Sequence, residues 1–386
     1  MKSRVCMKKT LAALIVTLTC LLPPVPTAAA TVAAGKTAAA PVPGVTIQQS
    51  IESARIADPD VKTLQLQQQK AVKTRDNAAL SVTYLPGGGS LSSSYAQTVD
   101  SYQSAQNSLT AVNKNLSAQQ NVIDYGAIQK YTDYLNAVNS YELAKRNTLS
   151  AQNKLRAATY GRKAGLISAS DLNAVKDALD TALKDEDAAK LTVEKTRSLL
   201  AQKMNIDPAK ITKPASLPAL TKVNRSTLDE ESQRAFNYSV TLWQAEQDQA
   251  LKENRLNWMI LNGTNTTNQD YQISILSTES KKTEIRQSVE SAYYALQTAE
   301  ARVSSSQITL RQAETALKQA QAKYAAGTIA RYSITGSNDL SSAELTVVKA
   351  RTDLVSAQAA LVVQKSQFYN TTGRSPYDPA DWTPAK

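Results

Sequence analysis

The side chains that most often carry out chemistry in proteins are scarce in this sequence. It has 386 residues and no histidine, which removes the commonest metal ligand and the commonest general base together. Both cysteines, Cys6 and Cys20, lie in the N-terminal segment that we identify below as an export signal. Because no arrangement of nucleophile, base and orienting group is recognisable in a chain without His and with Cys only in this segment, we predict a protein that is not an enzyme and needs no cofactor.

Two other motifs resemble binding sites but lack the residues that would complete them. The glycines at 87–89 are not followed by the Gly-Lys-Ser/Thr of a phosphate-binding loop. The acidic run 185–187 has no partner ligands at metal spacing and is flanked by Lys184 and Lys190, which favours a solvated helix face. We therefore predict no metal site.

The N-terminus has the pattern of a signal peptide over residues 1–30. Four basic residues precede an apolar run at 10–22, and three alanines at 28–30 offer a cleavage site. This run is too short to span a bilayer, which takes about 20 residues. The net charge is +11, of which +4 lies in this signal, and the remaining charges are interspersed rather than clustered. An exported chain of this kind is not expected to bind nucleic acid.

Composition and punctuation predict an all-α fold with two repeats. Aromatic residues make up 5% of the chain, which suits long helices packed through narrow seams. Proline and glycine clusters, and a break at Asp58-Pro59, divide the chain into helical segments. The segments are predicted at 46–79, 95–162, 170–205, 226–260, 281–324 and 337–371. The predicted organisation is a flexible Ala/Pro leader at 31–45, repeat 1 at 46–212, a linker at 213–225, repeat 2 at 226–373 and an irregular tail at 374–386.

Apolar residues recur at alternating steps of four and three in repeat 2. A 3.5-residue period over about five heptads indicates antiparallel coiled-coil packing, with alanines that let helices approach closely. The heptads alone do not exclude the simplest interpretation, which is a plain antiparallel coiled coil. The seam residues are Ile285, Val289, Ala292, Leu296, Ala299, Val303, Ser306, Leu310, Ala313, Leu317, Ala320 and Tyr324, then Ala343, Val347, Ala350, Leu354, Ala357, Leu361, Gln364 and Phe368.

Each repeat has one glycine turn between its two longest helical segments. Gly165 and Gly327 are 162 positions apart, and each is followed by a helix that opens with Asp-Leu, at Asp171 and Asp339. Both glycines stand where a helix C′ residue adopts the left-handed conformation. The chain therefore contains one helical hairpin used twice.

These turns, with the ending Phe-Tyr-Asn-Thr-Thr-Gly at 368–373, resemble those of the TolC-type outer membrane efflux proteins. The resemblance covers nearly all of the chain after residue 45. It implies that three protomers build a twelve-helix tunnel. Its entrance tip would dock on a periplasmic adaptor, or membrane fusion protein, that links the tunnel to an inner-membrane pump.

The resemblance also assigns residues. Gly165, Leu166, Gly327 and Thr328 would form the adaptor-docking tip. Asp171, Arg331 and Asp339 are candidates for the gate that narrows the entrance, with Arg331 as partner of one of the two aspartates.

The sequence departs from this family where the membrane hairpins are expected. The breaks at 81–94 and 261–280 are short, and only 271–277 offers a plausible strand. A membrane strand needs about 9–11 residues. We therefore expect little or no β-barrel and doubt that this chain inserts into the outer membrane by itself.

Three functions remain open at this point. The leading prediction is an exported efflux duct that conducts small molecules or polypeptides across the cell envelope. The alternative is a structural coiled-coil envelope protein without transport activity. An adaptor ranks lower, because adaptors carry β-domains around one hairpin and this chain has two hairpins with almost no strand signal.

Overall fold

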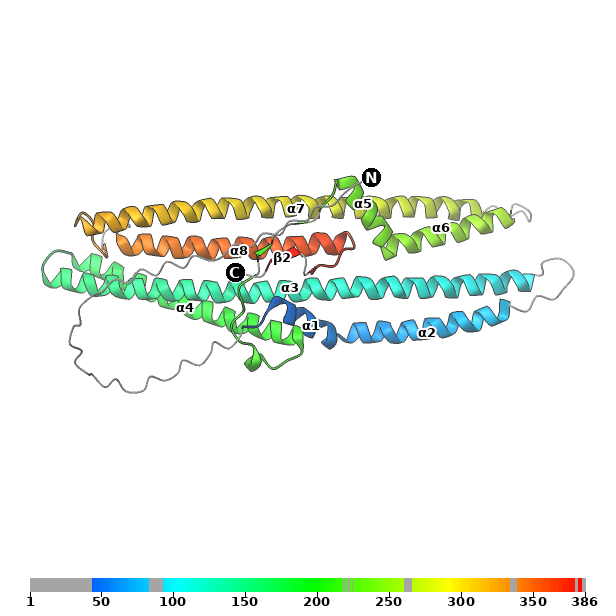
Figure 1. Ribbon diagram of the computed structural model, residues 1–386, viewed down its shortest axis with the longest axis horizontal. Coiled ribbons are helices and arrows are strands. Elements are labelled where there is room, and N and C mark those ends of the chain that lie inside the picture. Colours follow the sequence, from blue (N-terminus) through cyan, green and yellow to red (C-terminus); the bar gives the residue numbers. More distant parts are fainter. Residues whose placement is uncertain are drawn as a thin grey trace, which may run out of the picture. The chain divides into compact units, whose positions relative to one another are not determined.

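Long α-helices make up most of the described chain in the computed structural model (Figure 1). The structure describes residues 44–82, 93–217, 219–220, 223, 225–259, 266–333, 339–378 and 381–383. The predicted signal peptide and most of the predicted leader lie outside these residues. None of the described helices is long and apolar enough to cross a membrane.

Repeat 1 comprises four helices: α1 (Ile47–Ala57), α2 (Pro59–Val82), α3 (Ser93–Lys163) and α4 (Ala169–Met204). α1 begins with a capping box in which Thr46 and Gln49 bond to each other's backbone N–H. It ends at Asp58, whose extended backbone suits the residue before a proline. α3 is 71 residues long and extends about 105 Å at 1.5 Å per residue.

Repeat 2 has the same order of helices: α5 (Leu228–Tyr238), α6 (Val240–Met259), α7 (Thr266–Ala325) and α8 (Leu340–Thr371). A capping box between Thr227 and Glu230 starts α5, as Thr46 and Gln49 start α1. Between the repeats lie a short 3-10 turn, Pro208–Lys210, and the strand β1 (Ala219–Leu220).

The predicted helix at 226–260 is in fact two helices that meet at Ser239. The Ser239 backbone is extended, and its hydroxyl accepts a hydrogen bond from the Leu242 N–H at 3.1 Å. Serine therefore ends α5 and caps α6 without a proline. The sequence pattern missed the break because repeat 2 has no equivalent of Pro59.

The plausible strand at 271–277 is also wrong, because these residues lie inside α7. Hydroxyls that could have favoured a strand bond back to the helix instead, with Ser274 Oγ donating to the Tyr271 carbonyl at 2.6 Å. Thr278 does the same to Ser274. Of the two predicted breaks, residues 83–92 and 261–265 lie outside the described part of the chain.

The helices pack side by side in a defined order. α3 packs along α2 and α4, α7 packs along α6 and α8, and α3 and α8 contact each other. On the side that carries the glycine turns, the order of neighbours is α4, α3, α8, α7 (Figure 1). The hydrogen bonds and contacts between α3 and α8 join the two repeats.

The residues of the predicted heptad seam are buried or half-buried along α7 and α8, except Tyr324 at its end, which is exposed. Val289 and Leu296 are fully buried, and Phe368 of α8 packs against Leu296 in one apolar cluster. Nearer the turn, Ala313 packs with Val347 and Ala350 in a second cluster. α8 also buries residues on a second face, among them Ala359 and Val362, because it lies between α7 and α3.

Residues near both ends of the described chain contact the linker between the repeats, and the linker in turn contacts α3. Val45, at the end of the predicted leader, exchanges backbone hydrogen bonds with Lys213 and Ala215. Tyr131 of α3 is buried, and its hydroxyl donates to the Ala215 carbonyl at 2.6 Å. Within the predicted irregular tail, the strand β2 (Trp382–Thr383) pairs antiparallel with β1 of the linker.

Candidate functional site

The first glycine turn closes α3 with a complete Schellman motif. Gly165 has a φ of +72°. The N–H of Leu166 donates to the Gly161 carbonyl at 2.8 Å, and the N–H of Gly165 donates to the Arg162 carbonyl at 3.1 Å. This pair of bonds satisfies carbonyls at the end of the helix and directs the chain toward α4.

The second turn repeats the first at the end of α7. Gly327 has a φ of +69°. The N–H of Thr328 donates to the Lys323 carbonyl at 2.9 Å, and that of Gly327 to the Tyr324 carbonyl at 3.0 Å. The Thr328 hydroxyl also donates to the Lys323 carbonyl at 2.9 Å. The duplication inferred from sequence therefore extends to individual backbone hydrogen bonds.

Two other helix ends have the same motif. Asn205 ends α4 with a φ of 52°, and Gly373 ends α8 with a φ of +75°. A Cβ added at Gly373 would lie 2.3 Å from the Tyr238 ring, whereas one added at Gly165 or Gly327 meets nothing within 4 Å. Backbone conformation and close packing both favour glycine at 373, whereas backbone conformation alone favours it at the two turns.

The side chains around both turns face solvent. Leu166 is 79% exposed, and Tyr160, in the last turn of α3, is 72% exposed. Tyr324 is 42% exposed beside the second turn, and Thr328 is exposed as well. We call the residues around these two turns the hairpin tips: Tyr160, Gly165 and Leu166 in repeat 1, and Tyr324, Gly327 and Thr328 in repeat 2.

Asp171 has a structural role in the first tip. Its carboxylate accepts hydrogen bonds from the Ser168 N–H at 3.1 Å and the Ser168 hydroxyl at 2.7 Å, and the Asp171 N–H donates to Ser168 Oγ. These bonds from Ser168 lower the pKa of Asp171 below its usual range. The result is a capping box that starts α4.

Asp339 caps α8 and is almost fully buried. Its carboxylate accepts from the Ser342 N–H at 2.6 Å and from the Ser333 N–H at 2.8 Å. Lys154 of α3 lies 3.5 Å from the same carboxylate and links it to repeat 1. Burial opposes ionisation, but the two backbone hydrogen bonds and Lys154 outweigh it and lower the pKa of Asp339.

Arg331 does not form the predicted pair with either aspartate. Its guanidinium lies 3.7 Å from Glu344 and over the ring of Tyr332. Tyr332, by hydrogen bonding, and the charge of Glu344 raise the pKa of Arg331. The three gate candidates are therefore not brought together within one chain, since each has a separate partner.

Sequence reasoning missed Lys154 as the residue that joins the two hairpins. Lys154 also donates to Ser342 Oγ at 3.3 Å, and Ser150 and Ser341 share a hydrogen bond at 3.0 Å. Nothing marks Lys154 in the sequence, because the contact depends on how α3 and α8 are aligned along their lengths.

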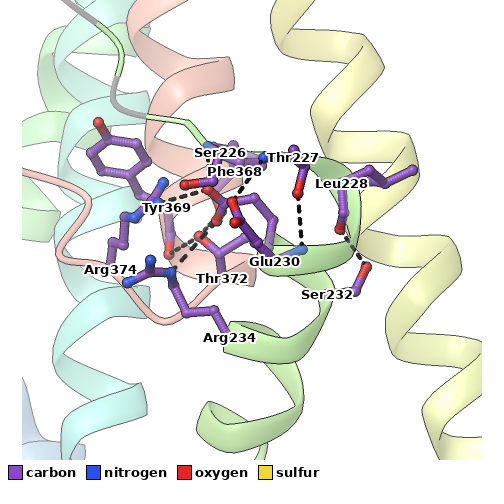
Figure 2. Close-up of polar contacts among 11 residues, drawn as sticks. Ser226, Thr227, Leu228, Glu230, Ser232, Arg234, Phe368, Tyr369, Thr372 and Arg374 are labelled. Atoms are coloured by element: carbon purple, nitrogen blue, oxygen red, sulfur yellow. Dashed lines mark hydrogen bonds and ion pairs between the residues drawn. The ribbon is translucent and has the colours of Figure 1, made fainter.

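A second polar cluster, also missed, joins the start of α5 to the end of α8 (Figure 2). Glu231 is fully buried and accepts from Arg374 at 2.6 Å and from the Ser226 N–H at 2.7 Å. The Arg374 guanidinium lies over the rings of Phe368 and Tyr369. The signal in the sequence that could have pointed to this cluster is an arginine directly after Gly373. Among the described residues, no group of three or more potential ligand side chains could hold a metal ion.

Residues 224–373 match the outer membrane efflux protein family. A comparison with curated proteins found no match. The structure of the open MtrE outer membrane channel of Neisseria gonorrhoeae is similar, with a TM-score of 0.62 and 16% identity, covering 85% of this chain and 89% of that one.

Two further solved structures are similar to the same extent. The VceC outer membrane protein of Vibrio cholerae has a TM-score of 0.61 and 12% identity, and the match covers 85% of this chain and 96% of VceC. The CmeC outer membrane channel of Campylobacter jejuni has a TM-score of 0.63 and 11% identity, with 85% of each chain covered.

The fold and the tips define a protein built from two copies of a long helical hairpin, each with its turn exposed to solvent. The predicted relationship to the TolC-type outer membrane efflux proteins is confirmed, by sequence over residues 224–373 and by fold over most of the chain.

Proposed function

We propose that this chain is an exported efflux duct of the cell envelope, with no chemistry of its own. Three copies form a tunnel that passes small molecules or polypeptides. Residues 1–30 direct export in this proposal. The observation that carries it is the pair of matching tips, because two long hairpins end in the same motif with side chains turned to solvent.

The open edges of the helical layer support a ring. α4 and α7 lie at opposite edges of the order α4, α3, α8, α7, and each keeps apolar side chains exposed. Leu191 of α4 is 65% exposed, and Leu183 of α4 and Ile308 of α7 are exposed as well. Contact between α4 of one copy and α7 of the next is heterologous, and such contacts form a ring when the rotation between copies closes. Three copies of this four-helix order supply twelve helices around the ring.

The tips are the proposed docking site for a periplasmic adaptor that couples the duct to an inner-membrane pump. Gly165 and Leu166 contribute one contact and Gly327 and Thr328 the other. Leu166 supports this role, since its side chain is 79% exposed at the end of a hairpin and contributes little packing to its own fold.

Opening of the entrance is proposed to require separation of the two hairpins. The contact between Lys154 and Asp339 holds α3 to α8 close to the tips. Asp171 and Arg331 remain gate candidates through contacts between copies rather than within one.

Crosslinking in cells tests the docking proposal. A photo-crosslinking amino acid replaces Leu166 or Thr328 in the full chain, and the same residue at the exposed Lys210 of the 3-10 turn serves as the control. We expect adducts with an adaptor from both tips and none from Lys210. Adducts from Lys210 alone, together with unchanged efflux after deletion of the protein, would favour a structural envelope protein.

A further inference from the structure

Two matching positions, one in the first helix of each repeat and one in the long helix it packs against, carry different charges in the two repeats. Arg55 and Phe236 each lie nine residues after the N-cap threonine of their repeat, Thr46 or Thr227. Asp124 and Arg286 each lie 41 residues before their tip glycine. The structure brings both pairs together, since Arg55 contacts Asp124 and Arg286 lies over the ring of Phe236.

Repeat 1 provides its own anion at this position. The Arg55 guanidinium bonds to both carboxylate oxygens of the buried Asp124, with Nε 2.6 Å from Oδ1. Such a two-bond pair satisfies the guanidinium within the chain. Repeat 2 has the guanidinium on the opposite helix, over an aromatic ring with its centroid 6.0 Å away. Within the described part of the chain, Arg286 forms no ion pair.

A hollow of about 420 Å³ opens beside Arg286, between α5, α6 and α7. We call it the α5–α7 hollow. Phe236 and Trp243 line it with two half-buried rings, and Lys282 and Arg286 line it with two cations. Glu246 supplies one negative charge, so cations outnumber carboxylates in the lining. Lys282 already bonds to Glu279 at 3.2 Å, which leaves Arg286 as the cation available to a ligand.

We propose that the α5–α7 hollow binds a small organic anion with an aromatic body. Its carboxylate pairs with Arg286, and its ring packs against Phe236 and Trp243. Arginine binds carboxylates through two parallel hydrogen bonds, and aromatic rings stack at an energetic gain beyond the burial of area. The volume falls within the usual range for small-molecule sites. A carboxylate side chain from a neighbouring copy is less favoured, because it satisfies Arg286 and leaves both rings uncovered.

This proposal does not depend on the efflux function, and ligand-observed fluorine NMR tests it on the full mature chain. The probes are 4-fluorobenzoate and the neutral 4-fluorobenzyl alcohol. We expect saturable line broadening of the benzoate and much weaker broadening of the alcohol. Arg286→Gln should raise the Kd for the benzoate about tenfold or more, since it removes a charge-assisted contact. Phe236→Leu should weaken binding as well.

Arg302→Gln is the matched control, since Arg302 is an exposed arginine of α7 outside the hollow. It should leave the Kd unchanged. The proposal is overturned if the benzoate does not bind, if Arg286→Gln binds it as well as the original chain, or if the alcohol binds equally. Loss of oligomer mass in Arg286→Gln with no effect on benzoate would instead assign Arg286 to a contact between copies. Circular dichroism confirms that each variant remains helical.

Discussion

Gly165 and Gly327 are glycines because of backbone conformation rather than lack of space. Both have positive φ, and neither has an atom within 4 Å of where a Cβ would lie. The chain itself shows which other residue fits, since Asn205 occupies the same position at the end of α4 with a φ of 52°. Asparagine tolerates this conformation better than other L residues.

Substitution at Gly165 can therefore separate folding from docking. Gly165→Asn should keep the Schellman bonds and the helicity but place a side chain on the tip, and so reduce adaptor crosslinking. Gly165→Val should destabilise the turn by about 1–2 kcal/mol, because a β-branched residue is strained at positive φ. Amide hydrogen exchange at Gly165 and Leu166 measures the difference. Equal loss of protection in both variants would show that the glycine is needed only as a cap.

Asp339 makes acid stability a second test at the residue scale. Its pKa is lower folded than unfolded, so its contribution to stability is present above about pH 3.9 and is lost as pH falls through the folded value. Asp339→Ala should cost about 1–2 kcal/mol at pH 7, as loss of an N-cap does, and less at pH 3. Urea unfolding at both pH values measures this. Asp187→Ala, at an exposed site of α4, is the control; a cost for Asp339→Ala that is independent of pH would contradict the account.

At the scale of elements, local signals in the sequence predicted most helices but not every boundary. Asp58-Pro59 and the two tip glycines are marked by residue type, so α1, α3 and α7 end as predicted to within a few residues. Ser239 breaks a helix through a hydroxyl cap that serine forms only in some contexts, so the α5–α6 boundary was missed. The contacts of Lys154 with Asp339 and of Arg374 with Glu231 depend on tertiary alignment, which periodicity alone does not determine.

The C-terminal tail is predicted to be held to α8 by a buried charge. Lys365 is fully buried, 2.6 Å from Asp381, with the Tyr369 ring 4.8 Å from its ammonium. Asp381→Asn removes the carboxylate that faces a buried ammonium and should cost about 3 kcal/mol. Lys365→Met should cost less than about 1 kcal/mol or stabilise the chain, and the double variant should resemble it. Urea unfolding measures the loss of stability in each variant. A larger loss for Lys365→Met than for Asp381→Asn would contradict this interpretation.

Lys365 should also make the free energy of unfolding depend on pH in the alkaline range. Burial lowers its pKa in the folded state, although Asp381 opposes the shift. The unfolded chain therefore binds more protons between that lowered value and 10.5, and stability should rise with pH across this interval. The rise should be absent in Lys365→Met, as measured by unfolding at pH 8 and pH 10. An unchanged slope in the variant would assign it to another group.

At the scale of the whole molecule, we propose that the edges of the helical layer carry the contacts between copies. A charge placed on an edge helix should disrupt contact between copies, whereas one on the central α3 should not. We expect Leu191→Glu on α4 to abolish the oligomer and Leu149→Glu on α3, at a side chain of similar exposure, to leave it intact, with helicity unchanged in both. Analytical ultracentrifugation distinguishes them. Dissociation in both variants or in neither would contradict the assignment of α4 as an edge.

The mass and cross-section of the purified mature chain test the central claim most directly. Native mass spectrometry with electron microscopy of the same sample gives both. A duct requires three copies of the layer to close into a hollow ring, because the exposed edges of α4 and α7 are on one chain and can meet only between copies. The account predicts a trimer with a ring-shaped cross-section. A monomer, or a dimer with a filled cross-section, would contradict it.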